Sequence, residues 1–389
     1  MFETLALQPA DALLALIGLH RDDPRPGKLD LGVGVYRDET RATPIMAAVK
    51  RAEEILLATR TTKSYLGPEG DLVFVDLLKP IVFGSDPGPR LTGVQTPGGS
   101  GALRLAAELI AQAKPAARVL VGQPTWPNHM PILKAVGLTV VPHPFFDVAT
   151  QTIDFAALKA AIAAAGPGDV ALLHGCCHNP AGADLSEGEW DELARLLAER
   201  GVLPLVDLAY QGLGRGLEED AAGTRRLVAQ LPEVLVAQSC DKNFGLYRER
   251  VGALYALTRD ADAAMAVRSN MAALARVNWS MPPDHGAAIV RTVLEDADLT
   301  RIWRGELDRM GARVLAVRAA LAAAEPRLAY LARQQGMFST LPLAKAQIDR
   351  LRVEHAVYMA GSGRINLAGL QVADVPVFVA ALAAVGFPG

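Results

Sequence analysis

The sequence predicts an α/β protein, a three-layer sandwich with a mostly parallel sheet, joined to a smaller α+β domain. Two observations lead to this prediction. Between residues 95 and 260, short apolar runs alternate with stretches of helical periodicity, which is typical of a parallel sheet with helices on both faces. After residue 286 the chain becomes rich in Ala, Leu, Arg and Glu, which indicates one or two long helices and then a second, smaller domain.

The elements of the sheet follow one another in a regular order. Strands are predicted at residues 117–122, 138–144, 169–175, 202–210, 233–240 and 251–257. Helices are predicted between several of them, at residues 101–113, 154–166 and 186–201. The last helix has a capping box, because Ser186 is followed three residues later by Glu189, and it ends at a glycine.

The domain boundaries follow from the change of pattern. A chain of 389 residues exceeds the ~250–300 residues at which a single core stops growing. We expect an N-terminal arm at residues 1–11, a large domain at 44–309, and a small domain formed by 12–43 together with 310–389. In the small domain, helices are expected near 343–356 and 372–385.

Composition excludes several classes of protein. A net charge of −3 provides no basic surface for nucleic acid or for anionic membranes. The apolar stretch from Ala12 to Leu19 is too short to span a bilayer and lacks a basic segment before it, so it predicts an amphipathic helix. The three cysteines do not form a disulfide framework. We therefore expect a cytoplasmic protein that binds neither nucleic acid nor membrane.

Polar and glycine-rich residues follow the predicted strands. The segments are TPGGSG (96–101), PTWPNH (124–129), HGCCHNPAG (174–182), Asp207 with Tyr210, and Ser239 with Lys242. Ligands of open α/β sheets bind beyond the carboxyl ends of the strands, so we expect these segments to converge. TPGGSG opens a helix and could hold an anion, although it matches neither the P-loop nor the GxGxxG spacing and could be a simple capped turn.

The segment HGCCHN raises the question of a metal. Its two histidines and two cysteines are close in sequence, but neighbouring strand residues point to opposite faces and structural zinc prefers CxxC-like spacing. We therefore predict no metal site. Asn179 then precedes a proline that ends the strand and directs its amide into the crevice.

Lys242 and Asp207 are the most informative polar residues. A lysine between two buried strands is expensive to bury unless it is modified, for example as a Schiff base with a carbonyl cofactor. A buried carboxylate needs a cationic partner, and a protonated heterocycle is one candidate. Lys242, Asp207 and the group Gly99, Ser100, Ser239 and Arg250 would supply the three parts of a pyridoxal phosphate site. The alternatives are a solvated loop lysine and a helix-capping aspartate.

These motifs together resemble the aspartate and aromatic amino acid aminotransferases of fold-type-I pyridoxal phosphate enzymes. The resemblance runs from end to end through LGVGVYRDE (31–39), TTKSYLGPEG (61–70), QTPGGSGALR (95–104), PTWPNH, HGCCHNPAG, DLAYQG (207–212), SCDKNFGLYRERVG (239–252), PPDHGA (282–287), GMFS (336–339) and GRINLAG (363–369). It implies a pyridoxal phosphate-dependent transferase fold, a homodimer with shared active sites, and amino acid and 2-oxo acid substrates.

The resemblance also implies roles for individual residues. Lys242 forms the Schiff base and moves the proton, Asp207 keeps the pyridine nitrogen protonated, Tyr210 and Asn179 bind the phenolic oxygen, and Trp126 stacks on the ring. Gly99, Ser100, Ser239 and Arg250 hold the phosphate, joined by Tyr65 of the neighbouring subunit. Arg364 binds the substrate α-carboxylate near Asn179, Trp126 and the Gly34 backbone. Arg276 of the neighbouring subunit binds a distal carboxylate. The alternative for Arg364 and Arg276 is that each forms an ordinary ion pair at the surface and binds no substrate.

Several positions depart from the family pattern. Asp241 replaces a small residue, Met281 an asparagine of aspartate-specific members, Ser64 a frequent asparagine and Ser100 a frequent threonine, whereas Val35 and Thr43 are aspartate-like. Methionine suits a pocket that repacks around different side chains. We predict dual specificity for aromatic and dicarboxylic amino donors, slightly favouring aromatic ones, with 2-oxoglutarate as acceptor. The alternatives are a strict aspartate aminotransferase, a β-lyase or decarboxylase, and a silent pyridoxal phosphate-binding protein.

Asp241 lies directly before the lysine, and its role stays open at this point. A carboxylate there could favour the protonated Schiff base and raise its pKa. It could equally point into solvent or pair with an arginine.

Overall fold

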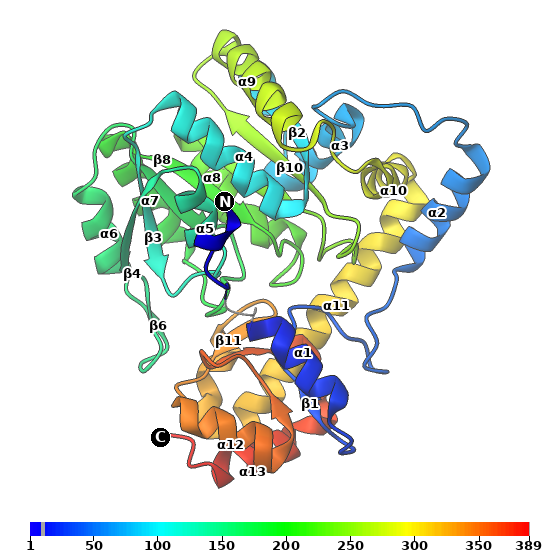
Figure 1. Cartoon of the computed structure of the whole chain (residues 1–389), viewed down its shortest axis with the longest axis vertical. Helices are drawn as coiled ribbons and strands as arrows, with labels where there is room; N and C mark the ends of the chain where they lie inside the picture. Colours follow the sequence, from blue (N-terminus) through cyan, green and yellow to red (C-terminus); the bar gives the residue numbers. More distant parts are fainter. Residues whose placement is uncertain (9–11, 389) are drawn as a thin grey trace.

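The computed structural model describes residues 1–8 and 12–388 of the 389-residue chain. The arm predicted for residues 1–11 therefore lies partly outside the described residues. Figure 1 shows a large domain around a central sheet and a small domain beneath it, which agrees with the predicted α/β class. In the described part of the chain, no helix combines the length and apolar character needed to cross a membrane.

The central sheet has seven strands in the order β2-β10-β9-β8-β7-β3-β4. Its strands are β2 (Leu91–Pro97), β3 (Arg118–Gln123), β4 (Thr139–Pro144), β7 (Val170–His174), β8 (Leu203–Leu208), β9 (Val234–Ser239) and β10 (Val251–Leu257). Only β10 runs antiparallel to its neighbours in this sheet, so the prediction of a mostly parallel sheet is confirmed. Every residue of β9 and β10 is buried, as expected for strands covered on both faces.

Alternate strand residues point to two different apolar cores, which makes the domain a three-layer sandwich. Leu205 and Leu235 pack with one set of helices, while Val206 and Val236 pack with the other. The first set comprises α4 (Gly98–Ala113), α5 (His129–Ala135) and α9 (Ala261–Trp279). The second comprises α2 (Ala47–Thr59), α3 (Leu72–Phe83), α6 (Phe155–Ala163), α7 (Glu187–Arg200), α8 (Leu217–Gln230) and α10 (Asp284–Glu295). The predicted capping box of Ser186 and Glu189 is present at the start of α7.

The small domain joins the two ends of the chain. Strand β1 (Leu29–Asp30) pairs in parallel with β12 (Val357–Tyr358), and β11 (Phe338–Thr340) pairs with the antiparallel β13 (Arg364–Asn366). Its helices are α1 (Ala12–Asp22), α12 (Lys345–His355) and α13 (Val375–Ala384). The short elements of the chain are the hairpin of β5 (Phe146–Asp147) with β6 (Thr152–Ile153) and the 3-10 helices η1 (Phe2–Thr4), η2 (Gly88–Arg90), η3 (Pro326–Arg333), η4 (Leu367–Gly369) and η5 (Val372–Asp374).

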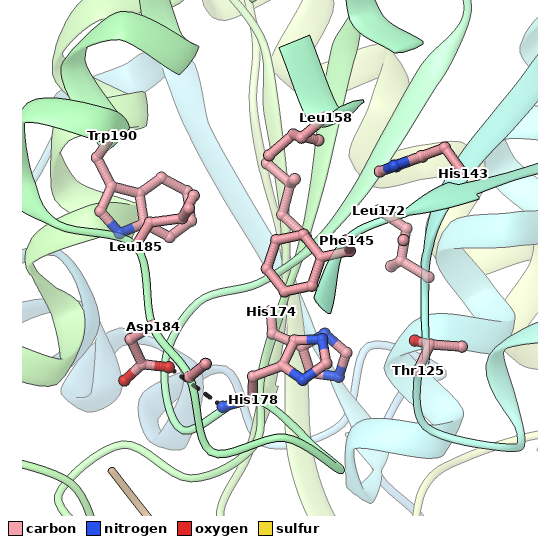
Figure 2. A pocket seen from close by; sticks show the side chains of 13 residues that line it. Thr125, His143, Phe145, Leu158, Leu172, His174, His178, Asp184, Leu185 and Trp190 are labelled. Carbon is pink, nitrogen blue, oxygen red and sulfur yellow. Dashed lines mark hydrogen bonds between the residues drawn. The ribbon is translucent and has the colours of Figure 1, made fainter. Parts of the chain in front are cut away.

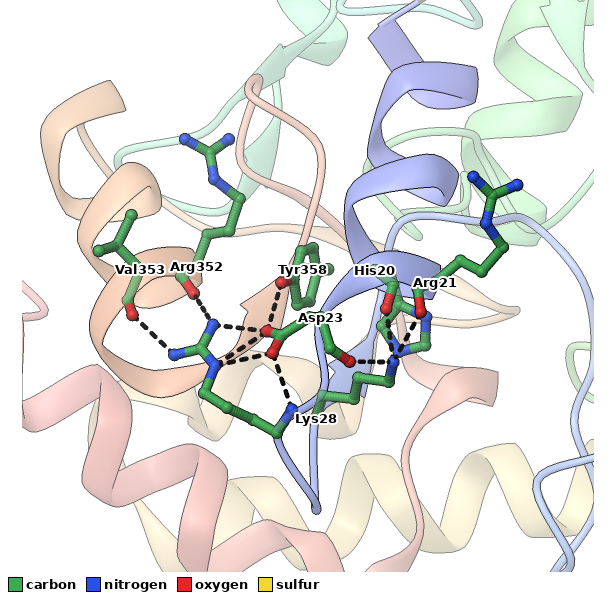
Figure 3. Close-up of polar contacts among 8 residues, drawn as sticks. His20, Arg21, Asp23, Lys28, Arg352, Val353 and Tyr358 are labelled. Atoms are coloured by element: carbon green, nitrogen blue, oxygen red, sulfur yellow. Dashed lines mark hydrogen bonds and ion pairs between the residues drawn. The ribbon is translucent and has the colours of Figure 1, made fainter.

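A polar network fastens the segment after α1 to the C-terminal part of the small domain (Figure 3). Asp23 accepts hydrogen bonds from Arg25 and, at 2.5 Å, from the Tyr358 hydroxyl. Arg25 also donates to the main-chain oxygens of Arg352 and Val353 at the end of α12. Residues more than three hundred positions apart in sequence are thus held side by side, as expected for an N-terminal segment that belongs to the small domain.

The helix α11 (Ala297–Ala324) connects the two domains (Figure 1). Its 28 residues correspond to about 42 Å at a rise of about 1.5 Å per residue. Asp296 caps its start by accepting from the main-chain nitrogens of Asp298 and Leu299. The predicted boundary at residue 310 lies inside this unbroken helix, and the division into domains stays a prediction.

Candidate active site

The predicted functional segments meet at one edge of the central sheet. The strands β2, β9, β8, β7 and β3 are parallel to one another and end at the same edge. Their carboxyl ends carry the glycines of α4, Ser239 with Lys242, Asp207, the HGCCHN segment and the PTWPNH segment. Main-chain pairing places His174 directly opposite Asp207. The expected convergence of these segments is confirmed.

Lys242 lies in the turn that follows β9 and is half-buried. Its Nζ atom is 5.1 Å from the centroid of the Tyr210 ring. Burial lowers the pKa of Lys242, although the charges of Asp241 and Asp207 act in the opposite direction. A lysine with a lowered pKa holds more of the neutral amine, which is the form that attacks a carbonyl.

Asp207 is buried at the end of β8, where its partner is His129, a residue that the sequence did not single out. The His129 Nε2 and Asp207 Oδ2 atoms are 3.1 Å apart, and the Thr125 Oγ1 atom is 2.7 Å from His129 Nδ1. Burial by itself would raise the pKa of Asp207, but the hydrogen bond and charge of His129, with smaller contributions from His174 and Lys242, outweigh this effect, and the pKa is lowered. The carboxylate is therefore ionised and able to stabilise a cationic ring nitrogen.

More histidines lie behind Asp207. Figure 2 shows His174 and His178 side by side in a pocket with Phe145, with ring centroids 4.1 Å apart for the two histidines. Burial lowers the pKa of His174 to about 3 and that of His178 well below the usual value, so both rings are neutral. The nearby Asp184 accepts a hydrogen bond from the His178 main-chain nitrogen. Neutral rings supply packing around Asp207 without adding a full charge.

An arginine and two aromatic rings form the other side of the site. Tyr210 and Phe338 meet edge to face with centroids 5.6 Å apart, and the Arg364 guanidinium lies 4.6 Å from the Phe338 centroid. Arg364 donates to the Asn179 side-chain oxygen at 3.5 Å and to the Gly32 main-chain oxygen at 2.8 Å. Its Nε atom is buried without a hydrogen-bond partner among the described residues. A carboxylate ligand would supply the missing acceptor.

Gly34 lies against the Phe338 ring. The main-chain oxygen that Arg364 contacts belongs to Gly32, two residues earlier. A methyl group on Gly34 would lie 2.9 Å from the Phe338 Cζ atom, so a side chain there would disturb the ring beneath Arg364. The predicted contact of Gly34 with substrate stays a prediction.

An anion cradle lies between the start of α4 and the turn after β9. A methyl group on Gly98 would be 2.7 Å from Arg250 Nη2, and one on Gly99 would be 3.0 Å from Ser239 Cβ. Ser100 follows in the first turn of α4, and no side chain caps this helix. Free main-chain N–H groups, the helix dipole, a hydroxyl and an arginine fit a phosphate. The residues predicted for the pyridoxal phosphate cofactor therefore form a site of suitable chemistry.

The remaining predicted residues are found in different surroundings. Trp126 meets His129 edge to face, with centroids 5.3 Å apart, and lies close to the Asp207 partner. Tyr65 is 91% exposed and lines a surface hollow with Ser64 and Met281. Arg276, near the end of α9, is also exposed. Tyr65 and Arg276 are therefore exposed in the single chain, and their predicted roles in a neighbouring subunit stay predictions.

The two adjacent cysteines are not arranged as the sequence predicted. We expected Cys176 and Cys177 to point to opposite faces of a strand, but β7 ends at His174 and Cys177 has a φ of 51°. Their sulfur atoms and an Asp220 oxygen all lie within 4.8 Å of one another. Asp220 accepts from the main-chain nitrogens of Gly212, Gly214 and Arg215. The hydrogen bond with Cys176, together with burial, raises the pKa of Cys177, which keeps its thiol protonated.

Comparison with known proteins places the chain among enzymes of one reaction type. Residues 26–382 match the model of the family described as aminotransferase class I and II. A tyrosine aminotransferase of Rhizobium meliloti is 56% identical over 96% of this chain and 97% of its own length. An aspartate aminotransferase of Salmonella typhi is 44% identical over 99% of this chain and 100% of its own. The crystal structure of an aromatic-amino-acid aminotransferase of Burkholderia pseudomallei, covalently bound to pyridoxal phosphate, has a TM-score of 0.96 at 36% identity and covers 99% of both chains.

Proposed function

The chain belongs to the class I and II aminotransferase family, and we propose that it exchanges amino groups between L-amino acids, both aromatic and dicarboxylic, and 2-oxoglutarate. It is a pyridoxal phosphate-dependent transaminase. The observation that carries the proposal is the arrangement around Tyr210. The Lys242 amine lies 5.1 Å from the Tyr210 ring, and Arg364 lies beyond the neighbouring Phe338 ring. An amine and a carboxylate-binding group thus lie on either side of the same pair of aromatic rings, which suits an α-amino acid.

The residues of this site suit the separate tasks of transamination. When bound, pyridoxal phosphate holds the amino group covalently and accepts the electron pair released from the substrate Cα. Lys242 would carry the proton from and to the substrate Cα, and Asp207 would hold the proton on the ring nitrogen. Tyr210 and Asn179 would bind the phenolic oxygen, and Trp126 would stack on the ring. Gly99, Ser100, Ser239 and Arg250 would bind the phosphate.

Substrate orientation depends on the arginines. Arg364 would bind the α-carboxylate with a planar fork of donors, with Gly34 close by. Arg276 of a neighbouring subunit would bind the distal carboxylate of aspartate, glutamate or 2-oxoglutarate. Binding both ends of a dicarboxylate fixes the Cα–H bond relative to the proton acceptor. Each half of the ping-pong cycle uses the same groups in opposite directions.

We propose that aromatic donors are slightly favoured. Met281 lines the same hollow as Tyr65, and an unbranched apolar side chain can repack around an aromatic ring. The test is a panel of half-reactions measuring kcat/KM for Asp, Glu, Phe, Tyr and Trp. Activity with both classes is expected. An aspartate value several orders of magnitude above that for phenylalanine would indicate a strict aspartate aminotransferase instead, and no reaction with any donor would indicate a silent cofactor-binding protein.

We also propose a homodimer with shared active sites. The face around Tyr65 is exposed, and Leu57 in α2 and Val277 in α9 are further apolar side chains that are 88% and 86% exposed. Burial of this face against a second copy would remove apolar area from water and bring Tyr65 and Arg276 to the partner's site. Sedimentation should give twice the chain mass. Mixing inactive Lys242→Ala and Arg276→Ala chains should restore dicarboxylate activity, because the hybrid contains one site without either substitution.

All three cysteines are buried free thiols. Reduced cysteines are typical of the cytoplasm, which we propose as the location of the enzyme.

A further inference from the structure

Asp241 lies in the anion cradle, which settles the question left open by the sequence. Its carboxylate forms an ion pair with Arg250 and accepts a hydrogen bond from the Val251 main-chain nitrogen at 2.9 Å. Its own main-chain nitrogen donates to Ser239 Oγ at 3.3 Å. The Asp241 side chain is 2% exposed, whereas that of Arg250 is 40% exposed. The carboxylate is thus buried inside the cradle and does not point into solvent.

The carboxylate also lies against the start of α4. A methyl group on Gly98 would be 2.9 Å from Asp241 Oδ2 and 2.7 Å from Arg250 Nη2. The negative charge is therefore placed near the positive end of the helix dipole as well as beside the arginine. These are the two cationic features that a phosphate in the cradle would use.

A bound cofactor phosphate would meet this carboxylate. A phosphate ester carries a charge of about −1.5 to −2 near neutral pH. Arg250 cannot give both anions the same hydrogen bonds, and two like charges in a buried space repel. Without cofactor, however, Asp241 compensates the charge of Arg250 and satisfies the buried Val251 nitrogen.

We propose that Asp241 is a built-in counterion of the phosphate cradle that competes with the cofactor phosphate for Arg250. The chain therefore binds pyridoxal phosphate more weakly than it would with a neutral residue at this position, and its cofactor-free form is more stable. The enzyme exchanges its cofactor more readily as a result. This inference rests on the proposed cofactor site and adds to it a residue that sets the affinity.

The experiment titrates cofactor-free enzyme with pyridoxal phosphate and with pyridoxal, and follows absorbance and protein fluorescence. Asp241→Asn is the main variant because its side-chain oxygen can still accept from Val251, and Asp241→Ser is the second. The control is Glu199→Gln, which neutralises an exposed acid at the end of α7. Pyridoxal lacks the phosphate and so reports any change at Lys242 alone.

Pyridoxal phosphate should bind about tenfold to a hundredfold more tightly to both Asp241 variants, because a hydrogen bond to a charged group contributes about that factor to an equilibrium. At a pH at which Lys242 is neutral in both proteins, affinity for pyridoxal should change little, and Glu199→Gln should match the wild type. The cofactor-free Asp241→Asn protein should unfold at a lower temperature than the wild type. Added cofactor should raise its melting temperature by more than it raises that of the wild type.

Two results would overturn the inference. One is an unchanged or weaker affinity of both variants for pyridoxal phosphate. The other is an increase in pyridoxal affinity as large as that in pyridoxal phosphate affinity, which would place the effect at the Lys242 amine. If the wild type itself failed to bind pyridoxal phosphate, the proposed function would fail as well, so the two failures are distinguishable.

Discussion

His129 and Asp207 form a buried pair in which the Nε2 and Oδ2 atoms are 3.1 Å apart. The pair joins the segment after β3 to the end of β8, 78 residues away in sequence. Because the carboxylate is buried, its ionisation depends on this one side chain more than on any charge in solvent. Substitutions on either side of the pair therefore test the site directly.

Replacing His129 by phenylalanine should reduce kcat by about tenfold to a hundredfold, since a hydrogen bond to a charged group contributes about 1.5–3 kcal/mol. The hydrogen bond from His129 lowers the pKa of Asp207, so its loss raises that pKa. The acid limb of the kcat profile should accordingly move to higher pH. Thr125→Val removes only the outer hydrogen bond and serves as the matched control, with a smaller effect. An unmoved acid limb in His129→Phe would show that the pair does not control the ionisation.

Replacing Asp207 by asparagine keeps the shape of the side chain but removes its charge. We expect kcat to fall by about a hundredfold to a thousandfold, as for other preorganised groups that stabilise developing charge. Cofactor binding, measured by absorbance, should persist because the phosphate cradle is intact. A variant with normal kcat would contradict the proposed role of Asp207 at the ring nitrogen.

Arg364→Lys and Arg276→Met should separate the two ends of the substrate. Arg364→Lys replaces a planar fork by a point charge, so kcat/KM should fall for phenylalanine and aspartate alike, by about tenfold or more. Arg276→Met should lower kcat/KM for aspartate and 2-oxoglutarate while leaving phenylalanine nearly unchanged. An equal loss for both donors in Arg276→Met would exclude a specific contact with the distal carboxylate.

The amine of Lys242 should react with pyridoxal at a lower pH than an ordinary lysine does. Burial lowers its pKa, and only the neutral amine attacks the aldehyde, so the rate should rise with pH and level off below the usual lysine range. The charge of Asp241 raises the Lys242 pKa, so Asp241→Asn should move the rise to still lower pH. Stopped-flow absorbance over a pH series measures the midpoint, and a shift upward in Asp241→Asn would contradict the assignment.

Arg318 should be important for stability rather than for chemistry. It is 1% exposed in α11, and its Nη2 atom donates to the main-chain oxygens of Gln335, Gly336 and Phe338. Arg318→Met would leave these acceptors without a donor, which destabilises by about 1–3 kcal/mol for each unsatisfied group. The melting temperature should fall by several degrees, whereas Arg309→Met, an exposed substitution on the same helix, should change it little. Equal melting temperatures for the two variants would show that the Arg318 bonds do not contribute.

Much of this architecture could be predicted because the local pattern determines it. Buried strands such as β9 and β10 are continuous apolar runs, and the polar residues that follow parallel strands must share one edge of the sheet. Lys242 and Asp207 could be identified because a charge at such a place needs a chemical reason.

The remaining features depend on contacts between distant segments. His129 lies in the segment PTWPNH, but no feature of the neighbouring sequence shows that its ring reaches Asp207. Nothing in the sequence distinguishes Arg318 from any other arginine in a helix, because the main-chain oxygens that it contacts belong to a later segment of the chain. Cys176 and Cys177 do not alternate as strand residues do, because β7 ends at His174. The partner of Asp241 is nine residues away, beyond a turn whose path the sequence does not specify.

The unbroken course of α11 has a mechanical consequence. Its first half packs with the helices of the large domain, including α2 and α10, and its second half packs with η3 and α13 of the small domain (Figure 1). A continuous helix transmits rotation along its length. A tilt of α11 relative to the central sheet would therefore move the small domain as a rigid body. Arg364 and the Phe338 ring beneath it lie on paired strands of this domain and would move together with it. The carboxylate-binding arginine and the ring that supports it would then keep their mutual geometry during such a motion.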